Sequence, residues 1–239
     1  MSTSPHPALE AIHGRYARVL ALGANGQRMT LSPGEAEHSR QEYARARFVS
    51  IPDILPSDQY GALVQAVLPL LSPLAERLSM RHERAKHGLS DGFRFARLDP
   101  ELSGHPQLSE KLKEILQRLG LVEFAATLAS QLTPLIRFVA GPVSFRRAYF
   151  YLYREGDYIS VHDDHQVGAR VDVQFPVSIG TRAGIRVLED GFLRMRYDEP
   201  GSMNILGPAV WHDVPPILSS DAGTEPLRFN MGYRFMPDR

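Results

Sequence analysis

The segment YISVHDDHQV, residues 158–167, places four side chains that can bind a metal at consecutive positions, directly after an apolar alternation. Side chains alternate between two faces in an extended strand, so His162 and Asp164 share one face and His165 points away from it. One imidazole nitrogen and one hard carboxylate oxygen together suit a divalent metal. We expect His162 and Asp164 to be two ligands of a metal site and His165 to lie outside the ligand set.

A third ligand is expected from a distant part of the chain. His212 in NILGPAVWHDVPP is the best candidate, 48 residues after Asp164, because it follows an apolar strand and precedes a proline-rich turn. Two histidines and one carboxylate leave three open positions on an octahedral metal, an arrangement typical of non-haem Fe(II) oxygenases. Without this third ligand, the His-x-Asp pair would be explained more simply as exposed turn residues.

The last predicted strand, in LRFNMGYRFMPDR, carries polar side chains on one face and aromatic or Met side chains on the other. The polar face holds Arg228, Asn230, Gly232 and Arg234. A glycine inside a strand indicates that something approaches the backbone closely at Gly232. Arg228 and Arg234 would lie roughly 20 Å apart along a straight strand. Two guanidinium groups folding toward each other would leave a gap for a small dicarboxylate; the alternative is an edge strand with solvated arginines.

The elements that position these residues fall into two parts. The first part is helical in period. An apolar stripe between residues 9 and 20 predicts one helix, and Ser57 could cap a second. Residues 107–138 predict a further helical stretch, broken near Gly120 and Pro134. Between the first two helices, residues 48–56 predict a short strand running into a turn. From about residue 141 the period changes to two, and Gly, Pro and Asp separate about seven short apolar segments.

So many strands in under 100 residues favour a barrel or jelly roll over a parallel sheet. We therefore predict an α+β protein forming one domain over residues 1–239. Residues 1–140 are expected to be mainly helical and to brace a β core, residues 141–239, that carries the metal site. This core would be a barrel or jelly roll.

The composition limits the remaining possibilities. The 239 residues contain 27 Lys and Arg, 27 Asp and Glu, and no Cys, so the net charge is zero and thiolate chemistry is excluded. Zero charge argues against a dedicated polyanion binder, which makes nucleic acid an unlikely partner. The beginning of the chain has no secretory pattern, and prolines and Gln65 interrupt the most apolar segment, so we expect a cytoplasmic protein without a membrane span.

Taken together, the residues resemble the Fe(II)/2-oxoglutarate-dependent oxygenases, whose pattern is His-x-Asp, a distal His and then an Arg. The matching residues here are His162, Asp164, His212 and, 16 positions later, Arg228.

The tail RFNMGYR is similar to the Arg-x-Asn-x-Thr-x-Arg element of the AlkB-type branch, with Gly232 at the Thr position. Upstream, Tyr153 and Gly156 match the Tyr-x-x-Gly segment of that branch, and Tyr151 replaces its asparagine. The matching motifs span roughly residues 149–236.

This resemblance implies a double-stranded β-helix (jelly-roll) core in which His162, Asp164 and His212 hold Fe(II). It also implies that Arg228 binds the far carboxylate of the cosubstrate 2-oxoglutarate. It also implies that O2 takes the last metal position. Arg234 would support either the near carboxylate of the cosubstrate or Asp164. Tyr153 and Asn230 would add hydrogen bonds to the cosubstrate. Because Asp164 is present, halogenation is not expected. Hydroxylation of a C–H bond is the default reaction, and desaturation, cyclisation or demethylation would use the same site.

The substrate is less defined by the sequence. Several arginines near the presumed mouth would suit a carboxylate-bearing small molecule such as an amino acid or a natural-product intermediate: Arg94, Arg97, Arg146, Arg170, Arg182 and Arg186. One alternative is an AlkB-type demethylase of nucleic acid or protein, for which the basic run 81–87 would be relevant. A second alternative is a non-catalytic, cupin-like binding module. The sequence does not indicate an oligomeric state.

Overall fold

The computed structural model describes residues 31–80, 93–98, 106–164, 170–220 and 223–238. The predicted helix in residues 9–20 and the basic run 81–87 lie outside these ranges, as does His165. Eleven strands form one strongly curled, mostly antiparallel sheet in the order β1-β9-β6-β11-β4-β3-β5-β10-β7-β8, with β2 paired to β3. The fold is α+β with a jelly-roll core, as the sequence predicts.

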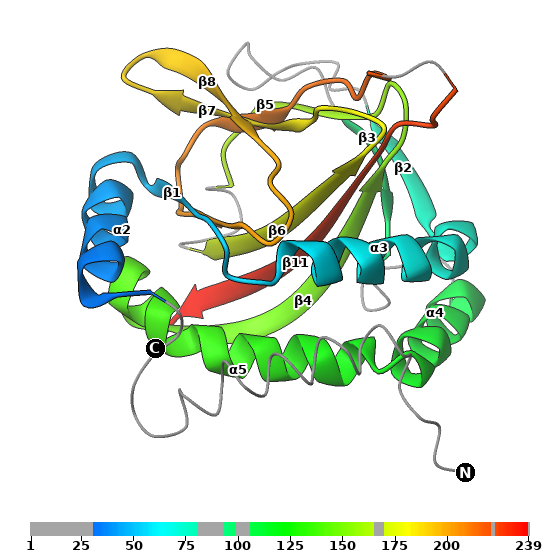
Figure 1. The fold of residues 1–239 in the computed structure, drawn as a ribbon, viewed down its shortest axis with the longest axis horizontal. Coiled ribbons are helices and arrows are strands. Elements are labelled where there is room, and N and C mark those ends of the chain that lie inside the picture. The colour runs from blue at the N-terminus through cyan, green and yellow to red at the C-terminus, as the bar shows by residue number, and fades with distance from the viewer. Residues whose placement is uncertain (1–30, 81–92, 99–105, 165–169, 221–222, 239) are drawn as a thin grey trace.

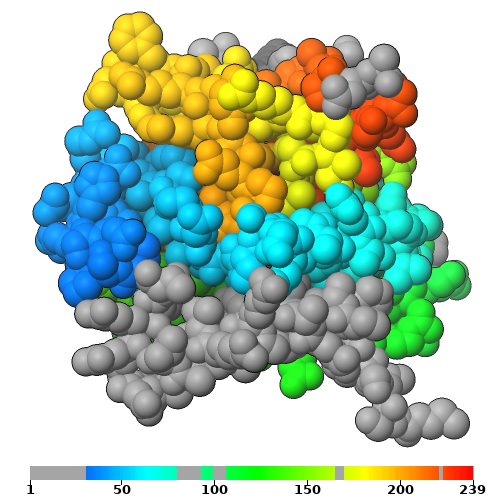
Figure 2. Space-filling view, in the orientation of Figure 1, coloured from blue at the N-terminus to red at the C-terminus, as the bar shows by residue number. Residues whose placement is uncertain are grey.

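The strands of the larger wall come from both halves of the chain. They are β1 (Phe48–Ile51), β2 (Glu76–Met80), β3 (Phe93–Arg97), β4 (Val143–Tyr153), β6 (Val171–Ile179), β9 (Met203–Leu206) and β11 (Leu227–Pro237). The opposite wall is formed by β5 (Tyr158–His162), β10 (His212–Val214), β7 (Gly184–Glu189) and β8 (Phe192–Tyr197). The β7–β8 hairpin projects from one corner of the molecule, above α2 (Pro33–Ala46) (Figures 1 and 2).

The helices lie against the larger wall (Figure 1). They are α2, α3 (Ser57–Leu71), the short 3-10 helix η1 (Ser72–Leu74), α4 (Pro106–Arg118) and α5 (Leu121–Ala140). Among the described residues no single helix is long and apolar enough to cross a membrane. Only α4 and α5 taken together, bent by 71° at their junction, reach that length and composition.

Strand β11 shows how the larger wall divides two environments. Its odd-numbered side chains, from Phe229 to Phe235, join the buried cluster that contains the apolar faces of α3 and α5. Its even-numbered residues face the interior of the barrel, where Arg228, Asn230 and Arg234 are buried as well. The predicted alternation is therefore confirmed, but both faces of the strand are buried.

Two predicted helix boundaries were wrong. Helix α5 continues through Pro134, although a proline inside a helix costs about 3 kcal/mol. Nine buried residues extend along α5 on both sides of Pro134, so packing of this face outweighs the lost hydrogen bond. Ser57 does not cap α3, because Pro56 occupies the cap position and no side chain caps the helix. The predicted apolar face of α3, including Tyr60 and Val64, is buried.

The turn between β4 and β5 sets the position of the strand that carries the first histidine. Gly156 adopts a left-handed conformation (φ 73°), and a Cβ there would overlap the Arg94 guanidinium. The next residue, Asp157, has a fully buried side chain that accepts hydrogen bonds from Arg77 and Arg94. The glycine predicted from the Tyr-x-x-Gly segment is therefore required by the turn conformation and by the close approach of Arg94.

Candidate metal and cosubstrate site

The structure brings the three predicted metal ligands together inside one end of the barrel. His162 is the last residue of β5 and lies directly opposite His212, the first residue of β10, in the antiparallel pair. Their ring centroids are 4.3 Å apart. Asp164 follows β5 by two residues, and one ligand atom from each of the three side chains lies within 4.8 Å of the others.

Hydrogen bonds to the backbone orient both imidazole rings. Nδ1 of His162 lies 2.7 Å from the carbonyl oxygen of Ser160, and Nδ1 of His212 lies 2.9 Å from that of Val210. A carbonyl can only accept, so each Nδ1 carries a hydrogen and each Nε2 presents a lone pair. Both Nε2 atoms lie 3.8 Å from an Asp164 carboxylate oxygen. This donor set fits a divalent metal ion.

The electrostatic environment favours the protonation states that a metal needs. Burial lowers the pKa of His162 to about 4, with help from the neighbouring His212, so its imidazole is neutral at neutral pH. Burial alone would raise the pKa of Asp164, but His212, Arg170 and His162 together bring it below its usual value. Neutral imidazole and ionised carboxylate are the ligand forms of these side chains.

A chain of buried charges continues from Asp164 into the barrel. Arg170 forms an ion pair with Oδ1 of Asp164, and its Nε lies 2.9 Å from Oδ2 of Asp172. Arg234 donates from Nε to the other oxygen of Asp172, at 3.1 Å. Arg234 is therefore held by Asp172, and it is Arg170 that contacts Asp164.

Arg228 lies at the start of β11, on the same inward face as Arg234, and is fully buried. Its Nε and Nη2 donate to the two carboxylate oxygens of Asp198 at 2.8 and 3.2 Å, so this pair does not use Nη1. Ser178 donates a further hydrogen bond to Asp198 at 2.6 Å. Asp198 directly follows β8, and no sequence motif marks it as a partner of Arg228.

Aromatic rings and one amide complete the wall around Arg228. Tyr153 lies opposite Arg228 in the β4–β11 pair, and its ring centre is 5.2 Å from the guanidinium carbon. Tyr151 lies opposite Asn230, whose side-chain oxygen is buried without a hydrogen-bond partner among the described residues. The predicted Tyr153, Asn230 and Arg228 thus occupy neighbouring positions on the inner surface.

Gly232 is required by a neighbouring ring. Tyr149 lies opposite it on β4, and a Cβ on Gly232 would overlap that ring. The Tyr149 ring also lies below Arg234, with 5.4 Å between the guanidinium carbon and the ring centre. The close approach predicted at Gly232 is therefore made by an aromatic side chain of the protein itself.

Most of the arginines predicted at the mouth take part in ion pairs within the protein. The pairs are Arg94 with Asp157, Arg97 with Glu76, Arg170 with Asp164 and Asp172, and Arg186 with Asp213. Arg182 instead lies over the ring of Tyr197, 4.0 Å from its centre. The four ion-paired arginines thus balance acidic side chains of the protein itself.

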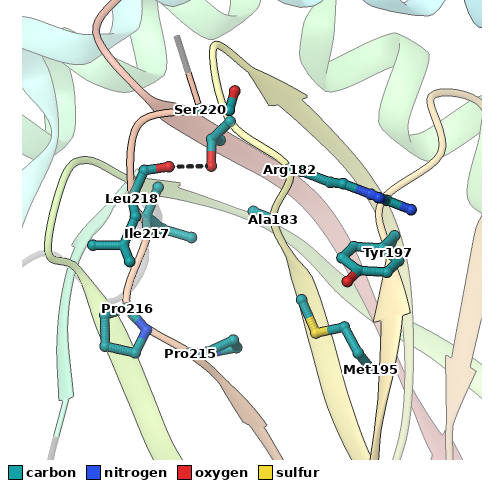
Figure 3. Close-up of a pocket in the computed structure, with 10 residues that line it drawn as sticks. Arg182, Ala183, Met195, Tyr197, Pro215, Pro216, Ile217, Leu218 and Ser220 are labelled. Carbon is teal, nitrogen blue, oxygen red and sulfur yellow. Dashed lines mark hydrogen bonds between the residues drawn. The ribbon is translucent and has the colours of Figure 1, made fainter. Parts of the chain in front are cut away.

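A hollow of about 350 Å³ lies between the β7–β8 hairpin and the segment that follows β10 (Figure 3). Arg182, Met195 and Tyr197 line one side of it, and Pro215, Pro216, Ile217 and Leu218 line the other. Its buried residues Ala183 and Ile217 belong to the same apolar cluster as Tyr153. The hollow therefore borders the apolar cluster that includes Tyr153.

Comparison with known proteins yields structural matches only. No family model matches the chain, and no curated protein sequence matches it. Its structure is similar to the non-haem 2-oxoglutarate-dependent epimerase SnoN from nogalamycin biosynthesis, with a TM-score of 0.57 and 13% identity over 86% of this chain and 84% of SnoN.

A prolyl-4-hydroxylase from Pseudomonas putida has a TM-score of 0.54 and 17% identity, over 85% of this chain and all of the hydroxylase. HygX from Streptomyces hygroscopicus, solved with nickel, 2-oxoglutarate and hygromycin B, has a TM-score of 0.53 and 13% identity, over 87% and 88% of the two chains. The chain therefore has the fold of the Fe(II)/2-oxoglutarate-dependent oxygenases.

Proposed function

We propose that this protein is an Fe(II)- and 2-oxoglutarate-dependent oxygenase that hydroxylates a C–H bond of a small molecule. The observation that carries the proposal is the geometry of His162, Asp164 and His212. Two Nε2 atoms, oriented by backbone carbonyls, face one carboxylate inside a jelly-roll barrel. The fold alone would not identify the chemistry, since one fold hosts many functions, but this ligand set is specific to few metal chemistries.

The cosubstrate would bind along the inner surface of β11. Arg228 would bind its far carboxylate through Nη1, the donor that Asp198 does not use, and Tyr153 would pack beside the same guanidinium. The unpartnered oxygen of Asn230 requires a donor, such as a water molecule bound with the cosubstrate. Fe(II), 2-oxoglutarate and O2 would together supply the oxidising equivalents for attack on a C–H bond.

The protein residues position the reactants and keep the metal ligands in their binding forms. The neutral His162 and the ionised Asp164 need no proton transfer before the metal binds. Buried aromatic side chains around Arg228 limit water near the cosubstrate. HygX, of similar fold, has been solved with hygromycin B, which supports a small-molecule substrate for this chain. The ion-paired arginines weaken our prediction of a carboxylate-bearing substrate.

An AlkB-type demethylase is the second candidate, because Tyr153, Asn230 and Arg228 match that branch and lie on adjacent strands. The two candidates differ in their partners. Binding to oligonucleotides with a steep salt dependence would favour the demethylase, whereas the zero net charge of the chain favours a small molecule.

Turnover of the cosubstrate tests the proposal. Fe(II)-loaded protein is incubated with 2-oxoglutarate, ascorbate and O2, and succinate is measured with candidate small molecules or methylated oligonucleotides present. We expect succinate formation that requires Fe(II), increases with a small-molecule substrate and is lost in His212→Ala. Stimulation by methylated oligonucleotides alone would support the demethylase. Metal binding without any succinate would support a non-catalytic module.

A further inference from the structure

Asp164 is the only carboxylate of the three-residue metal site, and its two oxygens have different surroundings. Oδ2 lies 3.8 Å from Nε2 of His212. Oδ1 lies 3.8 Å from Nε2 of His162 and is also in contact with the guanidinium of Arg170. A carboxylate oxygen bound to a guanidinium is a weaker donor for a metal. The two oxygens of Asp164 are therefore not equivalent.

Arg170 is itself fixed from its other side. Its Nε forms an ion pair with Asp172 at 2.9 Å, outside hydrogen-bond geometry, and Asp172 accepts a hydrogen bond from Arg234 at 3.1 Å. Arg170, Asp172 and Arg234 are all buried. Tyr149 packs against Arg234 and in turn fills the space above Gly232. Arg170 therefore forms ion pairs with both Asp164 and Asp172, which a planar guanidinium can do at the same time.

We infer that Arg170 is a positioning residue for the metal: it holds Asp164 in place and reserves Oδ1, so that Oδ2 alone is offered to the ion. This inference rests on the metal site of the proposed function but not on its cosubstrate. The role of Arg170 determines how many coordination positions of the ion the protein occupies. Two histidines and one oxygen leave three positions on an octahedral ion, whereas a second oxygen from Asp164 would leave two. A chelating 2-oxo acid and O2 together need three.

Partners of metal ligands commonly change metal affinity by 10–100-fold when they are removed. We therefore expect Arg170→Gln to weaken Co(II) binding 10–100-fold and to change the visible absorption of the Co(II) protein, because Asp164 is no longer held in place. Arg170→Lys keeps the positive charge but cannot bind two carboxylates at once. Its Co(II) affinity should therefore lie between those of wild type and Arg170→Gln. Asp172→Asn should shift the affinity in the same direction by a smaller factor, because Arg170 stays but loses its anchor.

The matched control is Arg186→Gln. Arg186 also pairs with an aspartate, Asp213, which is next to His212 in sequence. Both Arg186 and Asp213 are cross-strand neighbours on the outer side of the sheet, away from the metal ligands. Removal of Arg186 should leave the Co(II) affinity within twofold of wild type and the spectrum unchanged.

The measurements are a Co(II) titration of metal-free protein and an absorption spectrum, both without cosubstrate. If Arg170→Gln and Arg170→Lys bind Co(II) as wild type does, with the same spectrum, the inference is wrong. If Arg170→Gln fails to fold, Arg170→Lys and Asp172→Asn decide the question by the same criterion. Failure of the proposed oxygenase would appear differently, as wild-type protein that binds metal normally and releases no succinate.

Discussion

Arg228 and Asp198 form an ion pair whose side chains are 1% and 0% exposed, closed by hydrogen bonds of 2.8 and 3.2 Å. Asp198 raises the pKa of Arg228, against the lowering effect of burial. The cation expected to bind the cosubstrate therefore already has a counter-ion within the protein. A dicarboxylate that binds Arg228 must do so beside the negative charge of Asp198.

Removal of Arg228 should separate a stability effect from a binding effect. Arg228→Met leaves Asp198 buried and unpaired, which should cost about 3–5 kcal/mol in the free energy of unfolding. The double variant Arg228→Met/Asp198→Asn removes that charge and should recover most of the loss. Urea unfolding measures stability, and both variants should bind 2-oxoglutarate much more weakly than wild type. Recovery of cosubstrate binding in the double variant would remove Arg228 from the site.

Neutralising Asp198 alone should strengthen cosubstrate binding. In Asp198→Asn the cosubstrate no longer shares Arg228 with a negative charge. A nearby charge pair of this kind contributes about 1–2 kcal/mol, so we expect roughly tenfold tighter 2-oxoglutarate binding to the Ni(II)-loaded protein. Isothermal titration calorimetry measures it. Weaker binding would mean that Asp198 acts mainly to orient Arg228.

Gly232 should not tolerate a side chain. In Gly232→Ala the new Cβ overlaps the Tyr149 ring, and overpacking of this kind costs about 1–3 kcal/mol. Gly61→Ala in α3 is the control, because a Cβ there meets nothing within 4 Å. In a Tyr149→Ala background, Gly232→Ala should cost much less, which a double-mutant cycle of unfolding free energies can measure. An equal cost in both backgrounds would contradict the assigned contact.

The metal-free protein should lose stability in mild acid because of His162. Its pKa is about 4 in the folded state and about 6.5 when unfolded, so the unfolded chain takes up the proton first as pH falls. Between pH 6.5 and 4, wild type should lose up to about 3 kcal/mol more than His162→Gln. Unfolding at several pH values in EDTA measures this difference. Parallel stability curves would contradict the lowered pKa of His162.

The sequence was sufficient to predict the fold and the set of three side chains, His162, Asp164 and His212, that lie close together in it. The alternation along β11 is a local, period-two feature, and the structure retains it. Asp164 lies beyond the end of β5, so a bend rather than strand alternation brings it to His162. The carboxylates that bind the arginines could not be predicted in the same way. Asp198 lies 30 residues from Arg228 in sequence, and only the curl of the sheet brings them together. The continuous helix through Pro134 likewise depends on tertiary packing.

The central claim is that His162, Asp164 and His212 hold a metal to which 2-oxoglutarate binds with help from Arg228. The most direct test is a titration of 2-oxoglutarate into anaerobic Fe(II)-loaded protein, followed by the visible metal-to-ligand charge-transfer band. We predict a band in wild type that is absent in His212→Ala and that needs much more 2-oxoglutarate in Arg228→Met/Asp198→Asn. No band from wild-type protein with Fe(II) demonstrably bound would contradict the account.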